Sequence, residues 1–477
     1  MVFSSLQFIY FYLPVVLSLY FILPRPWRNA FLLSASLLFY AWGEGWYAFV
    51  MIASIVFNWV AGLILEKAPP SSRMTLLYGM VGINLAGLLY FKYTNFFVDN
   101  LNGVLGATAL GPMSLDHIHL PIGISFFTFQ AISYVVDIAR GQVKAQRNFI
   151  DYGMYKALFP QLIAGPIVRY RDVAGEVSAR RTSVEDIASG VGRFVVGLGK
   201  KVLIANVVAA PADLIFSLPA SELTPGLAWY GALCYALQIY FDFSAYSDMA
   251  IGIGRILGFH FLENFNFPYS AVSVRDFWRR WHISLSTWFR DYLYIPLGGD
   301  RHGPWRTAFN LFLVFLLCGF WHGASWTFIV WGLWHGLFLA AERQGLGRLV
   351  GAVPRPLQHA YAMVVVLVGW VFFRADTLGH AGDFLRAMAG FGVAPAGSPW
   401  PMDATNPEVQ FVIVCAVLAA LKLPLIAYQW VEGAVARRAW LGFAWQATRL
   451  TGLGAVMYFS TVALTASSFN PFIYFRF

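Results

Sequence analysis

The chain is organised around residues Arg275–Trp334, which read RDFWRRWHISLSTWFRDYLYIPLGGDRHGPWRTAFNLFLVFLLCGFWHGASWTFIVWGLW. Arginines and tryptophans surround His282, a Pro-Leu-Gly-Gly turn and a basic loop follow, and an apolar run then leads to His322. A histidine inside an apolar span is costly unless something pairs with it, so it marks a functional site. We expect the rest of the chain to form the membrane wall around that site.

The composition excludes a soluble globule. Of 477 residues, 58% are hydrophobic and only 12% charged, and the mean hydropathy is +0.61, far above the usual range for soluble domains. The first apolar run has no basic start and no cleavage signal, which predicts a retained span and not a signal peptide. The net charge of +9 then reflects topology and not binding of nucleic acid. The three cysteines show neither metal nor disulfide spacing.

The predicted fold class is all-α, a polytopic integral membrane protein. A span needs about 17 to 25 mostly apolar residues, and this rule gives about 11 to 12 transmembrane helices. The candidate ranges are 5–23, 29–43, 46–65, 74–97, 119–139, 194–217, 227–251, 306–321, 325–341, 357–373, 408–427 and 450–468. No internal repeat or flexible linker interrupts them, so we expect one membrane domain over 1–477.

Lysines and arginines collect in alternate loops and predict the orientation. They follow the first, third and fifth spans and recur in the same phase, whereas loops 98–118, 218–226 and 374–407 carry few cations. Cytoplasmic loops are the ones enriched in Lys and Arg. Both termini are therefore expected on the side away from the cytoplasm.

Two segments do not read as ordinary spans. Residues 120–130 mix Pro, Gly and polar side chains within an apolar run, and residues 159–169 are apolar but too short to cross. Irregular backbone at membrane depth persists only where it is buried in protein or faces a water-filled cavity. These segments predict re-entrant pieces that line a central tunnel.

His322 and His282 are the main candidates for chemistry. In the sequence FWHGASW, His322 is either a buried, hydrogen-bonded structural residue or a general base, since neutral imidazole accepts a proton near neutral pH. His282 lies in WRRWHISLSTW, which predicts an interfacial amphipathic helix anchored by tryptophans. In addition, Arg279 and Arg280 favour an arginine-lined mouth for a phosphate-bearing donor, because guanidinium groups suit phosphates.

Other polar residues keep two interpretations. Asp242 and Asp248 lie within or beside a span, where a structural ion pair and a catalytic carboxylate are both consistent with the sequence. His117 and His119 are two metal-type ligands without a third. The sequence leaves equally open the roles of three further residues, His335, Glu342 and Asp137.

The C-terminal tail, residues 470–477, follows Asn470-Pro471 and reads NPFIYFRF. It is either an aromatic anchor at the membrane boundary or a reactive segment in which Tyr474 is a nucleophile. Walker loops, dinucleotide-binding fingerprints and nucleophile elbows are absent from the sequence, which disfavours hydrolases and nucleotide-driven motors.

With two histidines about forty residues apart in WHISLSTWFRDYLYIPLGG and GFWHGASWTFIVWG, the chain resembles the membrane-bound O-acyltransferase family. Within it, the likeness is to the bacterial branch typified by the alginate O-acetyltransferase membrane subunit. It also includes MVFSS, PIGISFFTFQ, YFDFSAYSDMAIG and the terminal NPFIYFRF, and so covers nearly the whole chain.

The resemblance implies a ring of helices around a thin centre pierced by a tunnel, with His322 as the essential residue and His282 as a second polar position. A related subunit of teichoic-acid D-alanylation works with a peptide ending in Phe-x-Tyr-x-x-Phe, whose tyrosine is proposed to carry the acyl group. Phe472–Phe477 fits that pattern. The expected catalytic residues are His322, His282 and Tyr474. The expected substrate-binding residues are Arg279, Arg280, Trp281, Trp321, Asp242, Ser244 and Gln130.

The expected function is transfer of acetyl from cytoplasmic acetyl-CoA across the bacterial inner membrane to a periplasmic exopolysaccharide, alginate first and cellulose second. A phenol is a poor nucleophile until a base removes its proton, and the resulting aryl ester is still activated. It could pass acetyl to the serine of a periplasmic SGNH-type partner. Acetyl-CoA is a substrate here, and no resident cofactor, metal or nucleic acid is expected. The alternatives are a lipid or glycan transporter and a scaffold for polysaccharide export.

Overall fold

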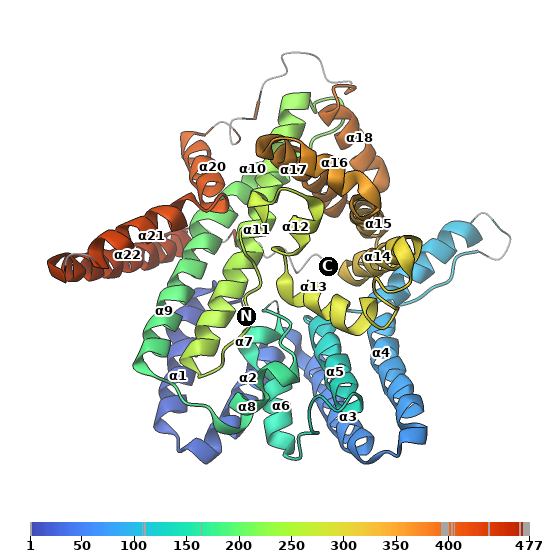
Figure 1. The fold of residues 1–477 in the computed structure, drawn as a ribbon, viewed down its shortest axis with the longest axis vertical. Helices are drawn as coiled ribbons and strands as arrows, with labels where there is room; N and C mark the ends of the chain where they lie inside the picture. Colours follow the sequence, from blue (N-terminus) through green and yellow to red (C-terminus); the bar gives the residue numbers. More distant parts are fainter. Residues whose placement is uncertain are drawn as a thin grey trace. The chain divides into compact units, whose positions relative to one another are not determined.

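The computed structural model describes residues 2–106, 108, 111–163, 165–392, 400–401, 404, 406–436, 439–466 and 469–470, and every regular element within them is a helix (Figure 1). The all-α prediction is confirmed. The longer helices are α1 Leu13–Ile22, α2 Arg28–Glu44, α3 Ala48–Lys67, α4 Pro70–Leu105, α5 Ile124–Ala139, α9 Val184–Gly199, α10 Asn206–Phe216, α11 Pro225–Ile256, α14 Gly303–His322, α15 Trp326–Ala341, α17 Arg355–Arg374, α18 Leu378–Met388, α20 Pro407–Ala420, α21 Leu423–Ala436 and α22 Ala439–Ala466.

Shorter helices connect them. They are the π-helices η1 Phe8–Tyr12, η4 Lys200–Ala205, η6 Arg290–Tyr294 and η7 Glu342–Leu346, the 3-10 turns η2 Arg25–Trp27, η3 Gly45–Tyr47 and η5 Pro268–Ser270, and α6 Phe149–Ala157, α7 Phe159–Leu162, α8 Tyr170–Ala179, α12 Val274–Trp278, α13 Ile283–Phe289 and α16 Gly347–Ala352. The described chain divides into two compact units, whose boundaries fall within α9 and α11. The first unit is Met1–Val191 with Ala250–Leu262, and the second is Gly192–Met249 with Glu263–Phe477. The expected single domain stays a prediction.

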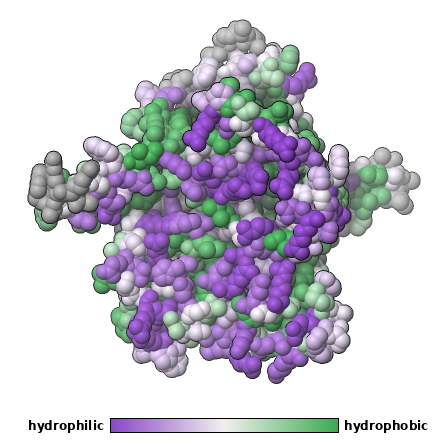
Figure 2. Space-filling model, in the orientation of Figure 1, coloured by the Kyte–Doolittle hydropathy of each residue, from purple (hydrophilic) through white to green (hydrophobic). Residues whose placement is uncertain are grey.

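Several helices have the length and apolarity of membrane spans. Among the described residues, five helices satisfy both criteria, and each of the twelve predicted ranges lies largely on helix. Large apolar side chains are exposed on many of them, with Trp46 83%, Phe443 85% and Phe411 68% exposed. Figure 2 shows hydrophobic side chains reaching the surface among hydrophilic ones. Such exposure suits a protein that meets lipid. The five spans are Arg25–Lys67, Pro70–Leu105, Val184–Phe216, Gly303–His322 and Arg355–Arg374.

The predicted span 408–427 is wrong as one continuous helix. The chain breaks after α20, where Lys422 adopts a left-handed backbone with φ 70°, and α21 continues at a bend of 64°. A positive φ is uncommon for a residue with a side chain and cannot continue a right-handed helix. The pair is a broken span or a re-entrant element.

In the first unit, the irregular segments predicted at 120–130 and 159–169 are buried in protein. Gly123 has φ 75°, and a Cβ there would lie 2.5 Å from the carbonyl oxygen of Leu162, so the two segments touch backbone to backbone. The amide of Ile122 donates to the Glu44 carboxylate at 3.1 Å, and its carbonyl accepts from the Tyr40 hydroxyl at 3.0 Å. The protein therefore satisfies backbone groups that a helix would have satisfied internally.

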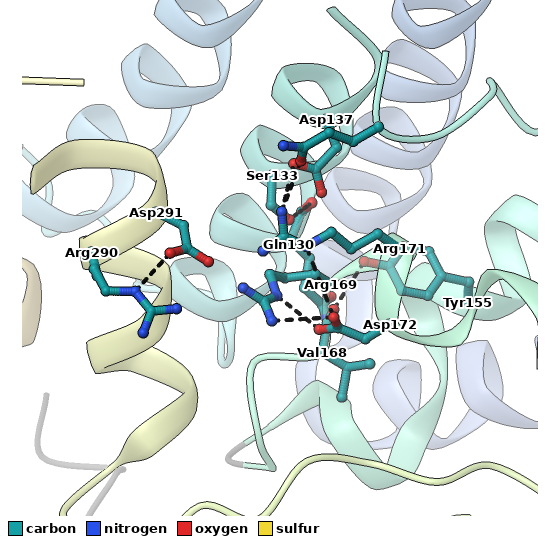
Figure 3. A network of polar contacts seen from close by, with 11 residues as sticks. Gln130, Ser133, Asp137, Tyr155, Val168, Arg169, Arg171, Asp172, Arg290 and Asp291 are labelled. Atoms are coloured by element: carbon teal, nitrogen blue, oxygen red, sulfur yellow. Dashed lines mark hydrogen bonds and ion pairs between the residues drawn. The ribbon is translucent and has the colours of Figure 1, made fainter. Parts of the chain in front are cut away.

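Polar side chains link the inner helices of the first unit (Figure 3). Arg169 pairs with Asp172 at 2.7 Å, and Arg171 approaches Asp137, which is fully buried, at 3.5 Å. Gln130 is also buried, and its carbonyl accepts from Ser133 at 2.8 Å. Asp137, whose role the sequence left open, is therefore part of a structural ion pair.

In the second unit, α14 and α15 cross at two glycines. A Cβ on Gly319 would lie 2.3 Å from the Phe328 carbonyl oxygen, and one on Gly332 would lie 2.3 Å from the Phe315 carbonyl oxygen. Small residues allow such close contact between helices in membranes. The crossing brings the end of α14 against α15, and α15 also packs on α17.

Candidate active site

His322 is the last residue of α14, at the crossing with α15. It is 6% exposed, and its ring lies among three aromatic rings, with centroid distances of 4.8 Å to Trp321, 4.9 Å to Trp331 and 5.2 Å to Phe373. The carboxyl end of a helix carries partial negative charge. An imidazolium formed at His322 would therefore be stabilised by α14 itself.

His282 lies between α12 and α13 in a left-handed backbone conformation, with φ 43°. It is fully buried; its ring stands edge-on to Phe243 at 4.6 Å and lies 6.5 Å from Trp321. Both histidine rings therefore lie near Trp321. Left-handed residues with a side chain cluster at functional sites, because the surrounding structure must compensate the strain.

Asn264 holds the His282 ring. Its side-chain oxygen accepts three hydrogen bonds, from His282 Nδ1 at 3.0 Å, from the Ser284 hydroxyl at 2.9 Å and from the Ser284 amide at 3.3 Å. Its amide nitrogen donates to Ser247 at 3.0 Å. Burial lowers the pKa of His282 to about 3, so the ring is neutral. Sequence reasoning missed Asn264, since no pattern in the chain links it to His282.

The second unit contains a cavity of about 500 Å³, and some of the residues that line it are close in sequence to the two histidines. Four exposed arginines line it, Arg275, Arg279, Arg290 and Arg343, which we call the arginine mouth. Buried apolar residues form other parts of its wall, among them Trp278, Leu285, Phe289, Val314, Cys318 and Leu339. Ile283 follows His282 directly, and Cys318 lies one helical turn before His322. The volume is typical of small-molecule sites.

Glu342 positions the arginine mouth. It begins η7, and its carboxylate accepts from the amides of Val274 at 2.8 Å and Arg275 at 3.0 Å, while the Tyr361 hydroxyl donates to it at 3.2 Å. A carboxylate suits the positive end of a helix. The five-residue helix α12, which carries Arg275 and ends next to Arg279, is thereby tied to α15 and α17.

Comparisons with known proteins identify the family of the chain. The model of the membrane-bound O-acyltransferase family matches residues 124–375. The chain belongs to that family. It is 42% identical to the probable alginate O-acetylase of Azotobacter vinelandii, with all of both chains covered, and 48% identical to that of Pseudomonas aeruginosa, with 82% of this chain and 75% of the relative covered. It is 38% identical to the peptidoglycan O-acetyltransferase of Helicobacter pylori, over 82% and 80%. This O-acyltransferase is a multi-pass membrane enzyme.

Of the seven residues predicted for substrate binding, Arg279 alone lines this cavity of the O-acyltransferase. Arg280 pairs with Asp276 at 2.8 Å and approaches the Asn266 carbonyl, and it is not part of the cavity lining, unlike Arg279. Trp281 is buried and stacks on Phe277 at 5.6 Å. Their proposed roles stay predictions.

The remaining predicted residues are dispersed. Ser244 is buried on α11, and its hydroxyl has no hydrogen-bond partner in the part of the chain that the structure describes. Gln130 belongs to the first unit, and Tyr474 lies outside the described residues. His119 contacts Glu44 at 3.1 Å, and His335 accepts from the Trp278 indole at 3.3 Å. The interaction with Glu44 gives His119 a structural role, and that with Trp278 does the same for His335.

Asp242 forms a buried ion pair. An ion pair at Asp242 was expected from the sequence as one alternative, but its partner was not predicted. Its carboxylate lies 2.7 Å from Lys201 Nζ, and both side chains are 2% exposed. Asp248 lies further along α11 and contacts Lys200 at 2.6 Å and Arg193 at 2.9 Å. Arg193 also pairs with Glu263. Lys201 carried a usable signal, because a lysine inside the predicted span 194–217 requires a buried partner.

Proposed function

We propose that this O-acyltransferase takes acetyl from cytoplasmic acetyl-CoA and passes it across the bacterial inner membrane for periplasmic O-acetylation of an exopolysaccharide, alginate first and cellulose second. The observation that carries the proposal is that both histidines lie near Trp321, while residues close to each of them in sequence line a cavity with an arginine mouth. The relatives named as alginate O-acetylases and as a peptidoglycan O-acetyltransferase support acetyl as the group transferred.

The cavity suits a phosphate-bearing thioester. Arginine binds phosphates with several donors in a fixed plane, and the four guanidinium groups of the mouth are exposed to solvent. The buried part of the wall is mostly apolar, with Thr307 as a polar member, and it includes Cys318 on the same helix as His322. Acetyl-CoA would bind with its phosphates at the mouth and its thioester toward the end of α14.

His322 then acts as the general base. It takes the proton of an attacking hydroxyl, the oxygen bonds to the thioester carbonyl carbon, and the carbon–sulfur bond breaks. The imidazolium returns its proton to the leaving CoA thiolate, so that charge and protons balance. His282, in the proposal, supplies a second nitrogen to the reacting groups beside Trp321.

Tyr474 is the proposed first acceptor. Its phenolic oxygen would carry acetyl as an aryl ester, whose leaving group is more acidic than an alkyl alcohol. A serine of a periplasmic SGNH-type partner would accept the acetyl group and pass it to the polymer. This sequence of steps requires both termini on the periplasmic side and a tunnel through the membrane, as the distribution of cations suggests.

Intact-protein mass spectrometry after incubation with isotopically labelled acetyl-CoA tests the proposal. We expect one labelled acetyl group on the C-terminal peptide in the unaltered protein and none in Tyr474→Phe or His322→Gln. Release of free CoA by the unaltered protein without any label on the protein would remove the relay but keep the transferase. Movement of a glycan or lipid across vesicles with no CoA release would favour a transporter and overturn the proposal.

A further inference from the structure

We propose that Asn264 is a positioning residue for acyl transfer, which holds His282 in the tautomer that carries its proton on Nδ1 and its lone pair on Nε2. The inference rests on the proposed function for its role in catalysis, but the tautomer itself can be measured without any reaction. In this proposal Asn264 acts on the reaction through its bond to His282.

The hydrogen-bond pattern fixes which atom of Asn264 faces the ring. A backbone amide can only donate, so the Asn264 atom that meets the Ser284 amide at 3.3 Å must be the carbonyl oxygen. The same oxygen lies 3.0 Å from His282 Nδ1. An oxygen that only accepts requires Nδ1 to donate, which leaves the lone pair of the neutral ring on Nε2.

The other half of the amide is compatible with this assignment, since a serine hydroxyl can accept its hydrogen bond. Asn264 Nδ2 donates to the Ser247 hydroxyl oxygen at 3.0 Å, and Ser247 is a buried residue of α11. The Asn264 carbonyl also accepts from the Ile283 amide at 2.9 Å, so both the main chain and the side chain of Asn264 are bound to the turn that holds His282. Asn264 is 1% exposed, and no water competes for these bonds.

This hydrogen bond restricts the neutral imidazole of His282 to one tautomer. In solution the neutral ring exchanges its proton between two nitrogens, and only one of them can face a reacting group at a time. A buried hydrogen-bond acceptor at Nδ1 fixes the tautomer before substrate binds. The ring then needs no change of tautomer during the reaction. The same logic explains why the group that orients a catalytic imidazole has a large effect although it never touches substrate.

Nitrogen-15 NMR of protein labelled only at histidine tests the tautomer directly. The chain has nine histidines, and the His282 signals are identified by their loss in His282→Asn, a residue that tolerates the left-handed backbone. We expect a protonated Nδ1 and an unprotonated Nε2 in the unaltered protein and in Asn264→Asp, which keeps the acceptor. In Asn264→Ala we expect a mixture of tautomers or the opposite one. An Nε2-protonated ring in the unaltered protein, or an unchanged spectrum in Asn264→Ala, would overturn the proposal.

Acetyl-CoA turnover of the purified protein tests the role in catalysis. We expect Asn264→Ala to lower kcat at least about tenfold with little change in KM, Asn264→Asp to restore most of it, and Asn266→Ala, at an exposed position of the same loop, to have no effect. In a His282→Asn background, Asn264→Ala should cause no further loss, because the two act as one unit. Losses that multiply would contradict positioning. Absence of CoA release from the unaltered protein would instead contradict the proposed function, while the NMR result would stand.

Discussion

Helix α11 carries two buried polar clusters that solve the same physical problem in different ways. At Asp242 the carboxylate meets the ammonium group of Lys201, so two charges compensate each other within protein. At Ser247 the helix contributes to a neutral chain of hydrogen bonds that runs through Asn264 to His282. The first cluster is a charged pair, and the second is a neutral, hydrogen-bonded imidazole.

The difference separates structural from chemical candidates. Removing one partner of a buried ion pair strongly destabilises the folded state. The expected role of such a pair is therefore structural. A neutral imidazole can accept or donate a proton near neutral pH, whereas a paired carboxylate and ammonium hold their charges fixed. Polar residues within apolar spans are therefore not equivalent. The kind of partner that each one has distinguishes a structural role from a chemical one.

The largest expected effect concerns His322. We expect His322→Gln to lower CoA release from acetyl-CoA by about 10²- to 10⁴-fold, since that is the usual contribution of a general base. His335→Gln is the matched control, because His335 is also a buried histidine of the second unit but accepts a bond from Trp278. Equal losses in both variants, with equal losses of thermal stability, would assign His322 to packing.

The ion pair comes next. Lys201→Met leaves Asp242 buried without its cation and should destabilise the protein by about 3–5 kcal/mol, measured as folded protein recovered after heating in detergent. The double variant Lys201→Met/Asp242→Leu should recover most of that loss, because both charges are gone. Full stability in the double variant together with no CoA release would move Asp242 from the structural to the chemical class.

A smaller effect is expected at the arginine mouth. Loss of a charged hydrogen bond costs about 1.5 kcal/mol or more, so Arg279→Ala should raise KM for acetyl-CoA about tenfold and leave kcat nearly unchanged. Arg280→Ala serves as the control, because Arg280 pairs with Asp276 and does not line the cavity. A larger increase in KM for Arg280→Ala than for Arg279→Ala would show that the cavity is not the donor site.

The smallest effect lies in the first unit, at His260. A hydrogen bond to Glu176 raises the pKa of His260, with Asp186 on its other nitrogen. The raised pKa in the folded state means that this contact stabilises fully below the unfolded pKa of about 6.5 and is lost as pH rises through the folded value. Amide hydrogen exchange at the end of α8 should quicken modestly between pH 6 and pH 8.5, beyond the intrinsic pH dependence, and this excess should be absent in His260→Gln.

Much of the fold followed from the sequence for a simple reason. Length and apolarity decide which segments can lie in lipid, so the predicted ranges fall on helices. The break near Lys422 had a local sign that the predicted range 408–427 passed over, because Pro424 favours the first turn of a new helix and disfavours continuation of the preceding one. The left-handed backbone of Lys422 itself has no such sign. The irregular segments were predictable only in part. Residues 120–123, which contain Pro and Gly, are irregular, but residues 124–130 belong to α5 and residues 159–162 form α7.

The site was predictable only where a residue was conspicuous by itself. His282 and His322 stand out because histidine is rare in apolar runs, and the structure places both beside Trp321. Asn264 lies in a loop between phenylalanines, and its bonds to His282 exist only in three dimensions. Arg279 and Arg280 are neighbours in the turn that follows α12, yet only Arg279 lines the cavity, because Arg280 is turned toward Asp276.

The glycine crossing of α14 and α15 has a mechanical consequence. The contacts at this crossing are made by backbone atoms at Gly319 and Gly332. Because no side chain lies between the two helices there, they cannot move relative to each other by a change of rotamer. When the hydrocarbon layer thickens or thins, helices usually respond by tilting. Here the two helices would have to tilt as a pair, carrying His322 and Trp331 with them, so the imidazole would keep its aromatic surroundings in bilayers of different thickness.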